Sequence, residues 1–136
     1  MKKERVKILY QHMTDEEKLL LQEKLHKIHI RRFVEHSLNR MSQKSIKKCE
    51  VMQVLSDYEI IELNYRMDSE KRKPRVLLRG NQTDQNGNVT CVVIELGKYG
   101  EVVTVYKNKR WDNHKQLIFD NYKEVYIKNL VTLVLS

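Results

Sequence analysis

The chain has 136 residues, of which 40% are hydrophobic and 32% charged, and its formal net charge is +8 at pH 7. This length and apolar content suit one ordinary hydrophobic core, so we expect a single domain over residues 1–136. The apolar stretches are too short to cross a bilayer, and the charged N-terminus lacks the apolar run of a secretory signal. The composition therefore argues against a membrane partner and favours the cytoplasm.

The chain before Pro74 contains neither proline nor glycine and reads as largely helical. Thr14 followed three residues later by Glu17 is a capping-box pattern, which predicts a helix that begins near Asp15. Apolar residues then recur at helical spacing, so we expect this helix to continue to about Arg31. A break near residue 30 and two shorter helical segments should follow, over residues 34–43 and 45–56.

From residue 58 onwards, β-branched and aromatic residues predict strands. Four strands are expected, at Tyr58–Tyr65, Arg75–Arg79, Val89–Leu96 and Glu101–Lys107. Turn residues between them indicate hairpins and antiparallel neighbours. In the tail, residues 112–136, the pattern fits a helix around residues 117–126 and a fifth strand over 130–135. The predicted fold class is α+β, with a helical N-terminal segment (1–31) and further helices packed on a four- or five-stranded antiparallel meander.

Cysteine and histidine spacing gives no metal or redox motif. Cys49 and Cys91 lie far apart in different predicted elements, so no disulfide is expected and both are interpreted as buried thiols. His26 and His29 follow Glu23 on one predicted helix, but the surrounding lysines and arginines would repel a metal ion. No P-loop, dinucleotide fingerprint or nucleophile elbow occurs, so we expect neither a metal nor a cofactor.

The positive charge is concentrated in residues 24–48. This stretch contains eight lysines and arginines and a single acid, Glu35, and such a density attracts polyanions. The eight cations are Lys24, Lys27, Arg31, Arg32, Arg40, Lys44, Lys47 and Lys48. A second group stands at the end of the fourth predicted strand, where a nucleobase could stack on an aromatic ring beside cations: Tyr106, Lys107, Lys109, Arg110 and Trp111.

Several short motifs follow one another in a set order between residues 36 and 111. They are His36-x-x-x-Arg40-Met41, a helix opened by Ser45-Ile46, the strand Pro74-Arg75-Val76-Leu77-Leu78-Arg79, and the strand Val102-Val103-Thr104-Val105-Tyr106. This order resembles a family of small bacterial and phage domains of unknown function, which are similar in layout to RelE and BrnT toxins. The resemblance implies a toxin-like α+β core over residues 32–111 that binds RNA and, if catalysis is retained, cleaves it without a metal. The family pattern often has Arg-Gly where this chain has Lys44-Ser45, which keeps the charge but loses the flexible glycine.

Four residues are candidates for the chemistry that this resemblance implies. His36 and Arg40 lie one helical turn apart, and a neighbouring cation favours a neutral imidazole that can accept a proton. Metal-independent RNA cleavage needs such a base together with cations around the phosphate. Arg75 and Arg79 flank Leu77 on one face of their strand and would form a phosphate clamp. A helix-borne histidine near a sheet is more often a structural residue than a catalyst, and the alternative for Arg75 and Arg79 is that they are solvated residues at the edge of a strand.

Two other functions are compatible with the sequence. The chain would be a non-enzymatic phage or bacterial regulatory protein if the amphipathic N-terminal helix bound a protein partner or a second copy of the chain. That alternative requires a contiguous apolar patch on the helix after the core is filled. DNA binding through the two short helices around Ser45 ranks last, because they lack the glycine-containing turn of many helix-turn-helix units.

Overall fold

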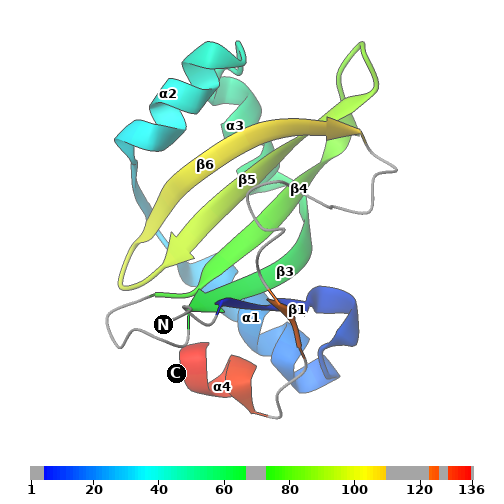
Figure 1. Cartoon of the computed structure of the whole chain (residues 1–136), viewed down its shortest axis with the longest axis vertical. Coiled ribbons are helices and arrows are strands. Elements are labelled where there is room, and N and C mark those ends of the chain that lie inside the picture. Colours follow the sequence, from blue (N-terminus) through cyan, green and yellow to red (C-terminus); the bar gives the residue numbers. More distant parts are fainter. Residues whose placement is uncertain (1–4, 67–72, 110–122, 126–128, 136) are drawn as a thin grey trace.

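The computed structural model describes residues 5–66, 73–109, 123–125 and 129–135. Within them the chain combines four α-helices with one largely antiparallel sheet (Figure 1), so the expected α+β class is confirmed. None of the described helices has the length and apolar character that a bilayer crossing needs.

An antiparallel meander forms the centre of the sheet. Its four consecutive strands are β3 (Tyr58–Arg66), β4 (Arg75–Thr83), β5 (Asn88–Leu96) and β6 (Gly100–Lys109). All four were predicted, although β4 is longer than expected and continues to Thr83. Between β4 and β5, Gly87 adopts a φ of 77°, a conformation that glycine reaches without steric cost.

Three short strands that the sequence did not predict complete the sheet. They are β1 (Arg5–Leu9), antiparallel to β3; β7 (Lys123–Glu124), parallel to β1; and β2 (Ile30–Phe33), parallel to β6. The strand order in the described residues is β2-β6-β5-β4-β3-β1-β7. Since β7 lies where a helix was expected, that reading of residues 123–124 is wrong; the rest of the expected tail helix falls mainly outside the described residues.

The first predicted helix, α1 (Asp15–Lys27), begins as expected and ends earlier. The capping box is confirmed: the Thr14 amide donates to Glu17 Oε1 at 2.9 Å, and the Glu17 amide donates to Thr14 Oγ1 at 3.2 Å. Beyond Lys27 the chain is extended, and the backbone amide of Gly100 donates to the His29 carbonyl at 2.8 Å. Arg31 therefore belongs to the edge strand β2 and does not lie on the helix.

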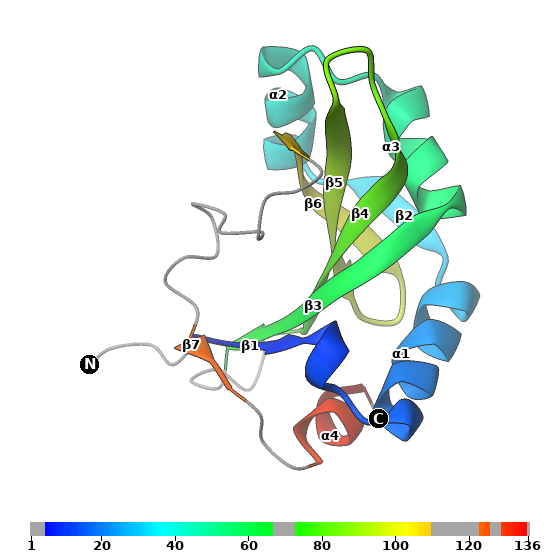
Figure 2. The same cartoon turned by 90° about the vertical axis from the view of Figure 1, so that its right-hand side faces the viewer.

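The helices lie on both sides of the sheet. In Figure 2, α1 and α3 (Lys48–Ser56) lie on one side of the strands and α2 (Glu35–Gln43), which packs along β6, lies on the other. The last helix, α4 (Leu130–Leu135), packs against α1 where a fifth strand was expected, so that prediction is wrong. This run of six residues is apolar except for Thr132, so it has no regular polar alternation from which its period could be read.

Two hydrophobic clusters cover the two faces of the sheet. The larger cluster lies under α1 and α3 and includes Leu21, Val54 and Leu78. The smaller one, on the opposite face, is built from Leu77, Val89, Cys91, Val93 and Val103. Register irregularities in β3 and β6 interrupt the simple alternation of side chains between these faces.

The turn between α2 and α3 closes with a Schellman motif. Ser45 has a φ of 55°, its amide donates to the Ser42 carbonyl at 3.3 Å, and the Ile46 amide donates to the Met41 carbonyl at 2.8 Å. Ile46 and Met41 are both buried, which supplies the hydrophobic contact of this motif. Ser45 thus occupies a left-handed position that glycine normally fills.

We expect Ser45→Gly to raise the free energy of unfolding by about 0.5–1 kcal/mol. The left-handed conformation costs a residue with a side chain about 1–2 kcal/mol, and the greater unfolded-state entropy of glycine offsets part of that gain. Urea unfolding measures the change. The control Ser42→Gly places glycine inside α2 and should lower stability by about 0.5 kcal/mol; a loss in both variants would contradict the assignment of strain to Ser45.

Candidate functional site

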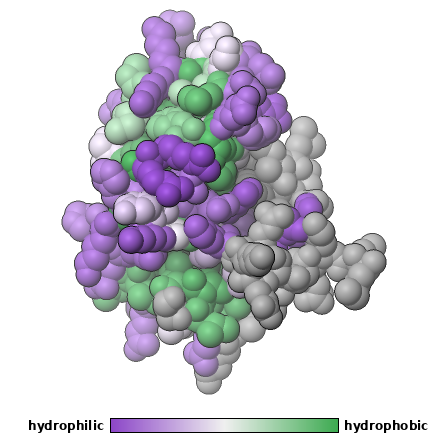
Figure 3. Space-filling view, turned by 90° about the vertical axis from the view of Figure 1, so that its left-hand side faces the viewer, coloured by the Kyte–Doolittle hydropathy of each residue, from purple (hydrophilic) through white to green (hydrophobic). Residues whose placement is uncertain are grey.

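The eight cations of residues 24–48, which we call the cationic segment, follow one edge of the molecule. Lys24 and Lys27 lie in the last turn of α1, and Lys44, Lys47 and Lys48 are exposed around the α2–α3 turn. Between them, Arg31 and Arg32 lie on the edge strand β2 with side chains 52% and 61% exposed. Figure 3 views the molecule from the side on which α2 lies in Figure 1, and hydrophilic side chains extend across its middle, between hydrophobic areas above and below.

Aromatic rings lie directly beside these cations. The Arg31 guanidinium carbon is 5.5 Å from the centre of the Tyr99 ring, and Lys98 Nζ is 5.6 Å from the same ring. Lys48 Nζ is 5.3 Å from the centre of the Phe33 ring. Tyr99 is 39% exposed, so one ring of this group is open to solvent next to positive charge.

A single carboxylate, Glu101, holds the two arginines of β2 in place. Arg31 NH2 donates to Glu101 Oε2 at 3.1 Å, and Arg32 Nε donates to the same oxygen. Both hydrogen bonds lower the pKa of the Glu101 carboxyl, and the bond from Arg32 has the larger effect. The acid stays charged at neutral pH and neutralises only part of the segment.

The same contacts predict a pH dependence of stability. Because the folded-state pKa of Glu101 is depressed, its contribution is complete above the ordinary glutamate pKa of about 4.3 and is lost as pH falls through the lower folded value. Thermal melts between neutral pH and about pH 3 should therefore decline less steeply for Glu101→Gln than for the wild type. Glu23→Gln, at an exposed position of α1, is the control and should melt like the wild type at every pH; identical slopes in all three proteins would contradict the assignment.

The four predicted catalytic residues form two separate pairs. His36 is exposed on α2, and Arg40 lies one turn further along the helix and is partly buried. Arg75 and Arg79 lie on β4, which β5 separates from β6 and α2. With about 4.8 Å between neighbouring strands, the backbones of β4 and β6 are about 10 Å apart, so the two pairs come from different elements of the fold.

Arg75 and Arg79 share a face of β4, as predicted, but each is held by a carboxylate. Arg75 Nε lies 3.1 Å from Glu95 Oε2, and Arg79 donates to Glu59 Oε2 from Nε at 3.2 Å and from NH2 at 2.7 Å. Four residues of strand place the two arginines about 13 Å apart along β4. Each guanidinium is thus engaged by a neighbouring acid, and the clamp on one phosphate stays a prediction.

The predicted group at the end of β6 is also divided. Tyr106 packs against the smaller hydrophobic cluster, next to Cys91 across the strands, and burial raises the pKa of its phenol. A stacking role for Tyr106 stays a prediction. Lys107 forms ion pairs and Lys109 is exposed, whereas Arg110 and Trp111 lie outside the described residues.

The two cysteines differ in their surroundings. Cys91 is fully buried, and burial raises the pKa of its thiol to about 12, so it is protonated and unreactive at neutral pH. Cys49 is exposed in the first turn of α3, so the expectation that both thiols are buried is wrong for this residue.

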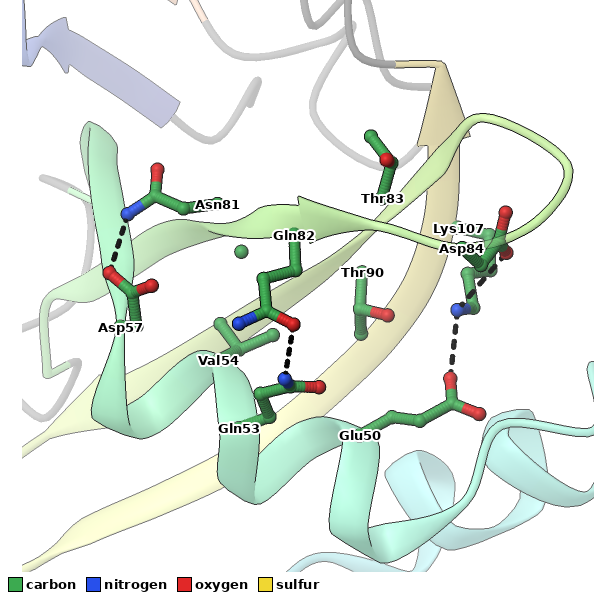
Figure 4. A pocket seen from close by; sticks show the side chains of 11 residues that line it. Glu50, Gln53, Val54, Asp57, Asn81, Gln82, Thr83, Asp84, Thr90 and Lys107 are labelled. Carbon is green, nitrogen blue, oxygen red and sulfur yellow. Dashed lines mark hydrogen bonds and ion pairs between the residues drawn. The ribbon is translucent and has the colours of Figure 1, made fainter.

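A polar cavity of about 220 Å³ lies between α3 and the hairpin of β4 and β5 (Figure 4). We call it the α3 pocket. Three polar interactions connect residues in or beside α3 with residues of the sheet. Lys107 Nζ lies 2.8 Å from Glu50 Oε2. Asn81 Nδ2 donates to Asp57 Oδ1 at 2.8 Å, and Gln53 Nε2 donates to Gln82 Oε1 at 2.5 Å.

The floor of the α3 pocket is tightly packed. A Cβ atom at Gly80 would lie 2.9 Å from Val54 Cγ2, so only glycine lets α3 approach β4 this closely. Thr90 lines the cavity and is only 6% exposed. At the rim, the backbone amide of Asn88 donates to Asp84 and lowers the pKa of that carboxyl.

Sequence reasoning did not find the α3 pocket. Its residues come from a helix, three strands and the segments beside them, and their spacing along the chain matches no motif. The only local signal was Gly80, directly after the predicted strand, because a glycine beside a strand often marks a close approach of another element.

Within the described residues, no group of three or more histidine, cysteine or acidic side chains is placed to hold a metal ion.

A family model, Domain of unknown function (DUF4258), matches residues 33–107, which include α2, α3 and almost the whole meander. The match confirms the expected kinship with a family of unknown function and has no link to RelE or BrnT toxins. No curated protein and no solved structure matches the chain. Because the model covers more than half of its residues, the chain belongs to the DUF4258 family.

Proposed function

We propose that this chain is a toxin-like RNA-binding domain whose cationic segment binds the phosphate backbone of single-stranded RNA. The observation that carries the proposal is the density of positive charge. Residues 24–48 contain eight cations and one acid, Glu35, and Glu101 pairs with two of these cations, Arg31 and Arg32. Neutralising phosphates with lysine and arginine releases counterions, which drives binding that does not depend on base sequence. The cations are accompanied by aromatic rings, an arrangement that favours a nucleic acid over other polyanions.

The aromatic rings support a single-stranded ligand. Unpaired bases expose their faces, and stacking on an aromatic side chain contributes about 1–3 kcal/mol per base. Tyr99 is exposed beside Arg31 and Lys98, and Phe33 at the end of β2 lies beside Lys48, so each of these rings has a cation next to it. A duplex would keep its base faces stacked inside and would gain only the phosphate contacts.

The test is fluorescence anisotropy with a labelled RNA of about 12 nucleotides in EDTA, compared with a duplex RNA and a single-stranded DNA of the same sequence. The proposal predicts salt-sensitive binding that is tightest for the single-stranded RNA. Equal affinity for all three polyanions would contradict the proposal that single-stranded RNA is the ligand. A failure to bind any of them would favour the alternative of a regulatory protein that acts through a protein partner.

Cleavage is a second candidate activity, because His36 is an exposed imidazole inside the cationic segment, one turn from Arg40. A phosphate bound by the segment would lie next to a potential base. Gel analysis of the same RNA after incubation in EDTA tests for cleavage. RNA fragments that form with the wild type and not with His36→Ala would assign cleavage to α2. Intact RNA with the wild type would limit the function to binding.

A further inference from the structure

We propose that the α3 pocket binds adenine or cytosine, the bases whose Watson–Crick edge places an exocyclic amine beside an acceptor ring nitrogen, from RNA that the cationic segment holds. This inference rests on the proposed function and extends it from backbone binding to base preference. The α3 pocket has a volume of about 220 Å³, which equals that of about seven water molecules at about 30 Å³ each. It is below the range of about 300–1,000 Å³ that is typical of pockets for drug-sized ligands, which suits one planar ring.

The walls of the α3 pocket offer hydrogen-bonding groups that read base edges. Side-chain amides pair in a bidentate manner with the amine and ring nitrogen of adenine, and carboxylates accept from the amine of cytosine. The pocket has three amides and three carboxylates around it: Gln53, Asn81, Gln82, Glu50, Asp57 and Asp84. Uracil lacks an exocyclic amine and presents two carbonyl oxygens, so carboxylates disfavour it.

Thr90 adds a hydroxyl to the lining of the pocket. The residue is only 6% exposed and lies in the cavity wall beside Gln82 (Figure 4). A hydroxyl both donates and accepts hydrogen bonds, so it can pair with either kind of group on a base edge. The neighbouring amides of Gln53 and Gln82 bond only to each other among the described residues and can exchange that bond for a base.

The charges around the mouth explain why a nucleotide fits better than a free cation. Lys47 is the N-cap residue of α3, three residues before the lining residue Glu50, and it is exposed. Lys109 follows Lys107 by two residues on β6 and is exposed on the same side of the strand. Cations at the mouth attract a phosphate and repel a free cation, while the carboxylates inside keep the phosphate out and accept the amine of the base.

The test compares oligoadenylate, oligocytidylate and oligouridylate of about 12 nucleotides at one salt concentration. We expect the wild type to bind the first two about tenfold more tightly than oligouridylate. Gln82→Ala and Thr90→Val should abolish that preference and leave oligouridylate affinity unchanged. Gln11→Ala removes an exposed amide far from the cavity lining and should keep the preference.

Two results would overturn the inference while the proposed function stands. One is equal binding of all three oligonucleotides by the wild type, and the other is a preference that survives in both pocket variants. If no oligonucleotide binds, the proposed function fails, and titration of ¹⁵N-labelled protein with adenosine and uridine monophosphates decides the inference. Shifts of the Gly80, Asn81 and Thr90 amides with the adenine nucleotide alone would support it; no shift with either nucleotide would overturn it.

Discussion

Replacing Lys44, Lys47 and Lys48 together with alanine is expected to weaken binding of single-stranded RNA about a hundredfold at about 0.1 M salt. Each phosphate contact on a single strand contributes about 0.7 to the slope of log affinity against log salt. Three contacts therefore contribute about two log units of affinity at this salt concentration. The slope itself should fall by about 2. All three lysines are exposed, so their removal should leave the thermal melt nearly unchanged.

The matched control removes the same charge elsewhere, at Lys7, Lys18 and Lys73. These lysines lie on β1, on α1 and just before β4, outside the cationic segment. The control should lose only the small affinity that follows from lower net charge. An equal loss in both triple variants would show that RNA responds to total charge alone, and would contradict a defined binding edge.

Leu78→Ala is expected to lower the free energy of unfolding by about 3 kcal/mol. Leu78 is 1% exposed in the larger hydrophobic cluster, between β4 and the helices α1 and α3. Its truncation removes apolar burial and leaves a cavity that the sheet cannot close. Urea unfolding followed by circular dichroism measures the effect, with an unchanged denaturant slope as the sign of intact two-state behaviour.

The control for this prediction is Leu19→Ala in α1. Leu19 is 56% exposed, and alanine is an excellent helix former, so the change should stay within about 0.5 kcal/mol. A similar loss at both leucines would contradict the placement of Leu78 in the core. A small loss at Leu78 alone would mean that α1 and α3 do not pack on β4 as described.

Local signals in the sequence predicted most of the fold. The capping box at Thr14 marked the start of α1, and alternating β-branched residues with Asn86-Gly87 marked the meander. β2 was missed because it has only four residues and pairs with β6, whose residues lie about 70 positions later in the chain. Its pairing depends on the tertiary fold, and helical spacing before it concealed the end of α1.

The candidate site was predictable in its charge and not in its geometry. Counting cations located the segment from Lys24 to Lys48, because charge density is a property of the sequence itself. The arginines of β4 looked available because their partners Glu59 and Glu95 come from other strands. For the same reason the α3 pocket left no signal apart from Gly80: its walls meet only after α3 packs across β4 and β5.

The most direct test of the central claim is the salt dependence of single-stranded RNA binding by the wild-type protein in EDTA. If the cationic segment binds the phosphate backbone through five or more of its cations, log affinity should fall against log salt with a slope of about −3.5 or steeper. A slope near zero, or no binding at low salt, would contradict the account.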